Sequence, residues 1–217
     1  QLGMRFKYTF QAKQKGIPDA INVANKFIAQ QPFVLALADN LFIGNSFQKT
    51  LKQVQSIKSG AAVLAVKTKY PSKSAVIDLG KKGKIKSIIE KPKKPKSNLT
   101  IPGLYFYDSE SKTVVRKLKP SKRGELEIVD VHLDYLEKQQ LKVFSLKKDI
   151  KWFDTGDAEE MLEASNYVHR YQKNKKTLVG SIELAALKNG WISKNKFKLM
   201  ISKYSNSQYK KNLQKFC

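Results

Sequence analysis

The hydrophobic positions of this chain form one strongly apolar run that ends in an acid. Residues 33–38 read Phe-Val-Leu-Ala-Leu-Ala, and Asp39 and Asn40 follow directly. Six consecutive apolar residues are typical of a strand buried on both faces of an α/β sheet. Such sheets bind ligands beyond the carboxyl ends of their strands, which makes Asp39 a candidate ligand of a metal or phosphate. Asp39 and Asn40 would equally suit a plain turn.

The segment before this run predicts a strand and a helix. Residues 6–10 alternate aromatic and polar side chains, as a half-buried strand does. Pro18 suits the first turn of a helix whose apolar positions continue to Ile28 at near-helical spacing. Together with residues 33–38 this is a strand–helix–strand pattern, for which we expect a right-handed crossover and parallel pairing.

The rest of the chain continues to alternate between the two periodicities. Gly80 and Gly83 predict a hairpin turn, and Pro102-Gly103 predicts a bulge or a close backbone approach. We expect helices over residues 46–59, 112–118, 125–137 and 158–173, and two more over 182–211 that are separated at 189–190. We expect strands over residues 61–67, 75–79, 85–89, 100–107 and 141–146, and a strand end at 152–157.

Composition narrows the class of protein. The 217 residues carry a formal net charge of +24, but only four of the 42 basic residues are Arg and the Lys residues are scattered. Nucleic-acid-binding proteins usually concentrate their charge and use Arg for bidentate contacts, so we favour a solvated surface over nucleic-acid binding. No apolar run approaches the ~18 residues of a membrane span. The single Cys217 cannot close an internal disulfide, which favours a reducing compartment, by default the cytoplasm.

Two polar segments are candidates for chemistry. Glu90-Lys91-Pro92 leaves a predicted strand and places an acid beside a base, although most such pairs are plain surface pairs. Arg123-Gly124 precedes a predicted helix, and a guanidinium beside a helix N-terminus can bind phosphate. The alternative is an ordinary helix start, with acids in the first turn favoured by the helix dipole.

A third segment, Trp152-Phe153-Asp154-Thr155-Gly156-Asp157, passes from a strand end into a helix. Asp157 suits an N-cap. Asp154 could join Asp39 as a second carboxylate on one Mg²⁺, an ion that takes few carboxylates and leaves sites for substrate phosphates. His132 and His169 stand singly on predicted helices, and we see no nucleophile arrangement of the Ser-His-Asp or Cys-His type.

Taken together, these segments resemble the sugar-1-phosphate nucleotidylyltransferases. The motifs Gly-Leu-Tyr-Phe-Tyr-Asp, Arg-Gly-Glu-Leu-Glu-Ile and Trp-Phe-Asp-Thr-Gly are specific in combination. The matching runs are Gln1-Leu2-Gly3 and residues 37–40, 88–92, 103–108, 123–130, 152–156, 163–166 and 189–192.

The resemblance implies an enzyme that transfers dTMP from dTTP to glucose-1-phosphate and releases pyrophosphate, with Mg²⁺ as cofactor. It implies that Asp39 and Asp154 hold the metal. It implies that the nucleotide is bound by Gln11, Gly16, Ile17 and Asp39. It implies that the sugar phosphate and the nucleotide-sugar are bound by Leu37, Asn40, Ala75, Glu90, Lys91, Ile101 and Arg123, with Lys91 and Arg123 as the catalytic cations.

This chain departs from the family pattern at several positions. Ala38 stands where the family has Gly, and Ser74-Ala75 stands where it has Tyr-Gly. Pro102 replaces a residue that is usually Thr, and the chain contains no Gly-x-Gly run. The family's Gly-rich loop, which cradles the triphosphate, would precede Gln1. We therefore expect a copy truncated at its N-terminus, with a catalytically dead binding or assembly module as the alternative.

The resemblance also sets the expected architecture. It implies an α/β fold with a Rossmann-like mixed sheet flanked by helices over residues 1–172, and a C-terminal helical extension over residues 173–217. It implies a homo-oligomer, a tetramer in the family, in which the C-terminal helices take part. Apolar positions such as Leu184 and Trp191 are expected to be covered in that arrangement.

Overall fold

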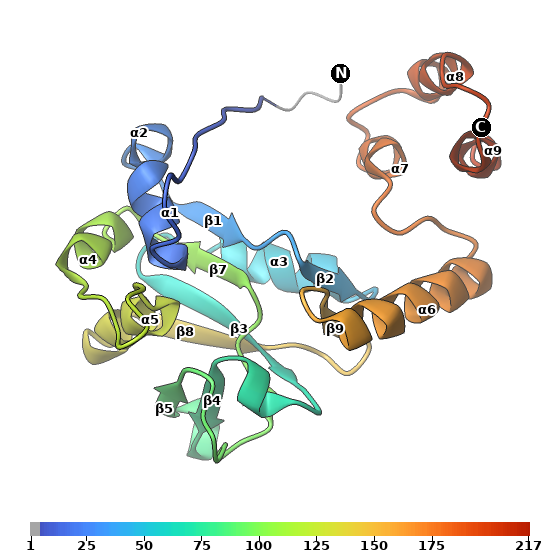
Figure 1. Ribbon diagram of the computed structural model, residues 1–217. Helices are drawn as coiled ribbons and strands as arrows, with labels where there is room; N and C mark the ends of the chain where they lie inside the picture. Colours follow the sequence, from blue (N-terminus) through green and yellow to red (C-terminus); the bar gives the residue numbers. More distant parts are fainter. Residues whose placement is uncertain (1–4) are drawn as a thin grey trace. The chain divides into compact units, whose positions relative to one another are not determined.

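A mixed sheet organises the structure, a computed structural model that describes residues 5–217 (Figure 1). The matching run Gln1-Leu2-Gly3 lies outside the described residues. The strands are β1 (Phe33–Ala36), β2 (Asn40–Ile43), β3 (Ala61–Lys67), β4 (Val76–Leu79), β5 (Ile85–Ile89), β6 (Leu99–Thr100), β7 (Leu104–Tyr107), β8 (Leu141–Ser145) and β9 (Lys151–Asp154). Among these residues, seven strands form a sheet of order β1-β7-β3-β6-β4-β5 with β8 beside β3, and β2 pairs with β9 separately. Of the strands in residues 5–217, only β3 and β8 pair in parallel.

Helices flank this sheet and form the C-terminal part of the chain. They are α1 (Ile17–Val23), α2 (Asn25–Ile28), α3 (Phe47–Gln55), α4 (Ser111–Lys117), α5 (Ile128–Glu137), α6 (Ala158–Lys175), α7 (Ile182–Lys188), α8 (Lys194–Ser202) and α9 (Gln208–Gln214), with 3₁₀ turns η1 (Pro71–Lys73) and η2 (Lys81–Gly83). One unit spans Tyr8–Met161, and Leu162–Cys217 belongs to a second. The units divide inside α6, which also contains the predicted boundary at residue 172.

The alternation of β3 and β7 builds a core on each face of the sheet. Val63 and Tyr105 pack with apolar residues of α1, α4 and α5 on one face. Leu64 and Phe106 pack with Val54 of α3 on the other. Successive side chains of a strand point to opposite faces, so continuous apolar strands can fill both cores. This confirms the predicted α/β fold with a mixed sheet flanked by helices.

Two predictions at the N-terminal end are wrong. Strand β1 is not buried on both faces, since Val34 is 46% exposed, and it lies at the edge of the sheet with β7 as its antiparallel neighbour. Residues 6–10 form no strand, and Phe10 is 83% exposed. The expected parallel strand–helix–strand unit is therefore absent from the described residues. Local alternation is only a propensity, because a strand also needs a neighbour to satisfy its backbone.

Other elements follow the predictions with shifted ends. The hairpin of β4 and β5 forms as expected. The expected strand over 100–107 divides into β6 and β7 at Pro102, which has no N–H to donate to a ladder. Helix α5 begins at Ile128, later than expected. Strand β2 was not predicted, and residues 182–214 hold three helices where two were expected.

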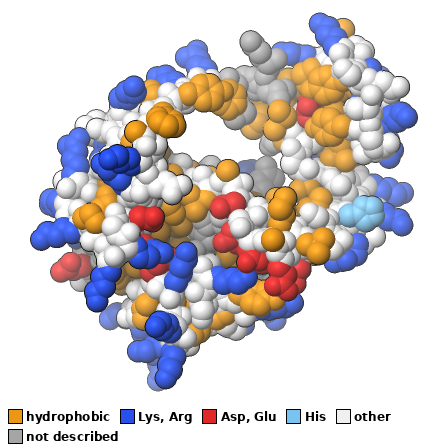
Figure 2. Space-filling model, in the orientation of Figure 1, with side chains coloured by type: hydrophobic (Ala, Val, Ile, Leu, Met, Phe, Trp, Pro, Cys, Tyr) orange, Lys and Arg blue, Asp and Glu red, His pale blue; other side chains and the backbone are white. Residues whose placement is uncertain are grey.

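The second unit has its own core. Phe197, Ile201 and Leu213 are buried in one cluster, and Ser residues cap α7, α8 and α9. Leu184 is buried as expected, but Trp191 is 62% exposed within this chain. No helix among residues 5–217 is long and apolar enough to cross a membrane. Basic side chains are spread over the face drawn in Figure 2, in keeping with scattered Lys residues.

Candidate active site

The carboxylates of Asp39 and Asp154 face one small gap. A Cβ placed on Gly156 would lie 3.3 Å from Asp39 Oδ2 and 3.2 Å from Asp154 Oδ1. The two acids are 115 positions apart and meet because β2 pairs antiparallel with β9, with Asn40 opposite Asp154. The sequence suggested strand ends of one sheet, whereas the structure uses a separate two-stranded sheet. Gly156 keeps the gap open because it has no side chain.

Backbone contacts hold this pair in place. Thr155 donates two hydrogen bonds to the Asp39 carbonyl oxygen, one from its N–H and one from its hydroxyl, both 2.8 Å long. The Gly156 N–H donates to Asp154 Oδ1 at 3.2 Å. The turn after β9 is thus joined by hydrogen bonds to Asp39, the residue directly before β2, so the positions of both acids are coupled.

Asn40 acts as the crosslink of this region. Its Oδ1 accepts hydrogen bonds from the Gly103 N–H and from Trp152 Nε1, each 2.7 Å long, and its Nδ2 donates to Asp39 Oδ1 at 2.8 Å. A side chain on Gly103 would collide with Leu37 Cδ1 at 2.6 Å, which confirms the expected close approach. Within the chain, Asn40 therefore positions Asp39, and the predicted contact of Leu37 and Asn40 with a nucleotide-sugar stays a prediction.

A second group of charged residues gathers around Glu90. Burial raises the pKa of the Glu90 carboxyl, Glu127 adds to this effect, and Lys91 and Arg123 oppose it. Lys91 has φ of +40°, a left-handed conformation that residues other than Gly rarely adopt. Such backbone strain is found preferentially at functional sites. The structure therefore brings Glu90, Lys91 and Arg123 within electrostatic reach of each other.

Arg123 already has a partner in this group. Its Nε and Nη2 donate to the two carboxylate oxygens of Glu127 at 3.1 and 2.7 Å, and the Ser121 hydroxyl donates to Glu127 as well. The Arg123 guanidinium lowers the pKa of Glu127. A phosphate would have to share or replace Glu127 as the partner of Arg123. Gly124, at φ +79°, supplies the turn that folds Arg123 back on Glu127.

Tyr105 connects the acid pair with the Glu90 group, and sequence reasoning missed it. It is 4% exposed, and its pKa is raised first by burial and then by the carboxylates of Glu90, Asp39 and Asp154. All three acids are therefore close enough to affect one hydroxyl. Tyr105 lies inside the motif Gly-Leu-Tyr-Phe-Tyr-Asp, and that motif was the signal that could have identified it.

The residues predicted to bind the nucleotide base, Gln11, Gly16 and Ile17, form a third cluster of candidate site residues. Gln11 Nε2 donates to Asp19 Oδ2 at 2.8 Å and to the Gly16 carbonyl at 3.3 Å. Gly16, at φ +92°, lies directly against the Leu126 backbone, while Ile17 begins α1 and packs against the core. This segment is joined to the α4–α5 connection that carries Arg123, since the Leu126 N–H donates to the Lys15 carbonyl at 2.9 Å.

Two predicted sugar contacts are largely covered. Ala75 is 7% exposed and Ile101 is 3% exposed. The Ile101 N–H donates to the Ala75 carbonyl at 2.9 Å, and the Thr100 hydroxyl donates to the same oxygen at 2.8 Å. Ala75 lies in the sheet next to the residues that follow β5, since Val76 pairs with Ile89 and the Lys91 N–H donates to the Ser74 carbonyl at 3.3 Å.

Comparison with known proteins identifies the family. The Nucleotidyl transferase family matches residues 1–171. A glucose-1-phosphate thymidylyltransferase of Neisseria meningitidis is 36% identical over 207 residues, which are 95% of this chain and 72% of that protein. This chain belongs to the nucleotidyl transferase family.

Other relatives agree with this membership. A glucose-1-phosphate thymidylyltransferase of Mycobacterium tuberculosis is 37% identical, over 88% of this chain and 66% of that protein. A crystal structure of such an enzyme from Bacillus anthracis, in complex with sucrose, has a TM-score of 0.69 at 33% identity. That match covers 76% of this chain and 65% of the other. UDP-glucose pyrophosphorylase in complex with UDP-glucose has a TM-score of 0.65 at 26% identity and covers 74% and 64%.

Proposed function

We propose that this chain acts in the Mg²⁺-dependent transfer of dTMP from dTTP to glucose-1-phosphate, which gives dTDP-glucose and pyrophosphate. The observation that carries the proposal is the facing pair of carboxylates, Asp39 and Asp154, in a nucleotidyl transferase chain. The glucose-1-phosphate thymidylyltransferases among its relatives support the choice of sugar and base. dTDP-glucose of this kind would supply dTDP-rhamnose for cell-surface polysaccharides.

The acid pair suits Mg²⁺ by its chemistry. Among residues 5–217 no three or more His, Cys, Asp or Glu residues form a metal-binding group, so the protein offers two carboxylates and no closed cage. Mg²⁺ is usually held by one or two carboxylates and completes its octahedron with waters and substrate phosphates. When bound between Asp39 and Asp154, it would neutralise phosphate oxygens near the reacting phosphorus.

The chain's own residues would bind and orient two polyanions. Lys91 and Arg123 would bind the phosphate of glucose-1-phosphate, and Glu90 would accept hydrogen bonds from sugar hydroxyls. In the reaction, a glucose-1-phosphate oxygen forms a bond to the α-phosphorus of dTTP while the bond to pyrophosphate breaks in line. Positioning and charge neutralisation supply most of such catalysis, so the protein needs no nucleophile.

A binding module without turnover is the second candidate. It is favoured by the pairing of Arg123 with Glu127, which leaves a predicted catalytic cation already engaged within the chain. Both candidates predict nucleotide-sugar binding, and only the first predicts pyrophosphate release. We also propose a cytoplasmic homo-oligomer, a tetramer as in the family, which sedimentation would test.

The test measures dTDP-glucose binding by calorimetry and pyrophosphate release from dTTP and glucose-1-phosphate, each with Mg²⁺ and with EDTA. Asp154→Asn removes one carboxylate charge at nearly constant volume, and we expect it to lower turnover by about 10²-fold. If the wild-type chain shows no turnover, we expect Asp154→Asn to weaken the Mg²⁺-dependent binding of dTDP-glucose instead. Gly156→Ala keeps both acids but narrows the gap, so it should weaken the Mg²⁺ response too. Asp134→Asn on α5 is the control. Equal behaviour of Asp154→Asn and the wild type would contradict the proposal.

A further inference from the structure

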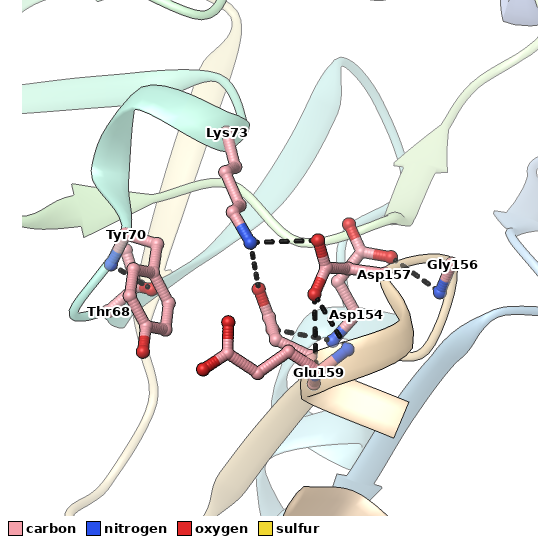
Figure 3. A network of polar contacts seen from close by, with 8 residues as sticks. Thr68, Tyr70, Lys73, Asp154, Gly156, Asp157 and Glu159 are labelled. Carbon is pink, nitrogen blue, oxygen red and sulfur yellow. Dashed lines mark hydrogen bonds and ion pairs between the residues drawn. The ribbon is translucent and has the colours of Figure 1, made fainter. Parts of the chain in front are cut away.

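Lys73 lies beside the acid pair but belongs to neither group of predicted site residues. Its Nζ is 2.8 Å from Asp157 Oδ2 and 3.9 Å from Glu160 Oε1. Figure 3 shows the Lys73 side chain pointing toward the carboxylate of Asp157. It comes from η1, which leads into β4, whereas its two partners stand at the start of α6. The ion pair therefore joins the β4–β5 hairpin region to the segment that follows Asp154.

The position of Lys73 is itself supported. Its ammonium lies 4.9 Å from the centre of the Tyr70 ring, a cation–π distance. The Tyr70 N–H donates to Thr68 Oγ1 at 3.1 Å, which shapes the turn before η1. Lys73 thus comes from a short loop between β3 and β4 that is ordered by these contacts.

The partners of Lys73 hold the backbone that carries Asp154. Asp157 Oδ1 accepts the N–H groups of Glu159 and Glu160 at 3.1 and 3.2 Å and so caps α6, as the sequence suggested. Glu160 Oε2 accepts the Asp154 N–H at 3.3 Å, and Glu160 is only 8% exposed. One carboxylate therefore contacts Lys73 with one oxygen and the Asp154 backbone with the other.

Lys73 balances part of the negative charge around the turn that follows Asp154. Asp39, Asp154, Asp157 and Glu160 place four carboxylates around one short turn. Like charges at such separations repel each other, and a cation among them reduces this repulsion. Lys73 supplies that cation from a different part of the fold.

We propose that Lys73 is a positioning residue for the metal pair: by binding Asp157 and Glu160 it fixes the turn over residues 154–157, so that Asp154 faces Asp39. This inference rests on the metal role of Asp39 and Asp154 in the proposed function. A positioning role and a simple charge effect predict opposite changes in cation affinity when Lys73 is replaced. Removing a nearby positive charge would by itself tighten cation binding, whereas loosening the turn weakens it.

The test compares Lys73→Met, Lys73→Arg and Lys138→Met in the full chain. Lys138 forms a matched control pair with Asp134 at 2.6 Å, and both lysine side chains are 43% exposed. Ion pairs this exposed add little to global stability, so the variants should fold. The first measurement is amide hydrogen exchange over residues 154–160 without metal. We expect faster exchange in Lys73→Met, wild-type exchange in Lys138→Met, and near wild-type exchange in Lys73→Arg.

The second measurement is Mn²⁺ binding, followed by the electron paramagnetic resonance of the free ion. We expect Lys73→Met to weaken Mn²⁺ binding about tenfold, the lower end of the effect of residues that orient metal ligands. Unchanged exchange, or tighter Mn²⁺ binding, would overturn the inference. A wild-type chain that binds no Mn²⁺ would refute the metal assignment and with it the positioning of a metal pair, and the exchange data would still show whether Lys73 holds the turn.

Discussion

At the scale of single residues, His132 shows how burial decides protonation. The ring is fully buried, Nε2 is 2.8 Å from the Tyr107 hydroxyl oxygen, and Nδ1 has no hydrogen-bond partner in the described part of the chain. Burial lowers the pKa of His132 to about 3. The imidazole is therefore neutral in the folded protein and serves the core, as expected for an isolated histidine.

This burial predicts a specific loss of stability in acid. The unfolded chain protonates His132 below about pH 6.5, while the folded chain stays neutral until about pH 3, so stability falls as pH drops between these values. Between pH 7 and pH 5 the free energy of unfolding should fall by about 2 kcal/mol from this group. Urea unfolding at both pH values checks this. His132→Gln should remove that share of the pH dependence, and His169→Gln, an exposed position on α6, should keep it.

At the scale of elements, α8 shows how a short helix is held by one face. Phe197 and Ile201 are fully buried four positions apart, while Leu199 is 60% exposed on the same helix. A seven- to nine-residue helix is marginal alone, so tertiary packing rather than propensity stabilises it. The second unit depends on this small core.

Phe197→Ala should therefore destabilise residues 178–217 by about 3–5 kcal/mol, since the removed ring leaves a cavity. Leu199→Ala should change stability by less than about 0.5 kcal/mol, because that side chain is exposed. Limited proteolysis, with peptides identified by mass spectrometry, gives the result for this unit separately. Equal cleavage rates in the two variants would show that the cluster around Phe197 contributes little.

At the scale of the whole molecule, the net charge of +24 favours contact with polyanions in general. The basic residues are mostly Lys and are spread over the surface drawn in Figure 2. A spread charge neutralises few phosphates of one duplex at a time, so its binding should be weak and non-specific.

We therefore expect duplex DNA to bind with a Kd no tighter than about 10⁻⁵ M at physiological salt, without sequence preference. Fluorescence anisotropy at several salt concentrations measures this, with dTDP-glucose binding followed in parallel. Tight, sequence-dependent DNA binding without nucleotide-sugar binding would favour a nucleic-acid function instead.

The sequence pattern was enough to predict those strands, turns and helix caps that depend only on residues close together in the chain. Strand β3 was predicted with its observed ends, because the six continuous apolar residues from Ala61 to Val66, followed by Lys67, leave few alternatives. The β4–β5 hairpin followed from its glycines, and the N-cap at Asp157 from its place before α6. The resemblance to the nucleotidylyltransferases, carried by three motifs, identified the family and selected Asp39 and Asp154.

Tertiary structure decided everything that depends on which distant segments meet. The apolar run at 33–38 became an edge strand because its only described neighbour is β7, a fact that no local pattern contains. Asn40 accepts hydrogen bonds from Trp152 and Gly103, and Arg123 donates to Glu127. Hydrophobic periodicity reports which face of a segment is buried, but hydrogen bonds and ion pairs between remote residues follow from packing alone. For that reason the contact of Lys73 with the turn after Asp154 emerged only from the folded chain.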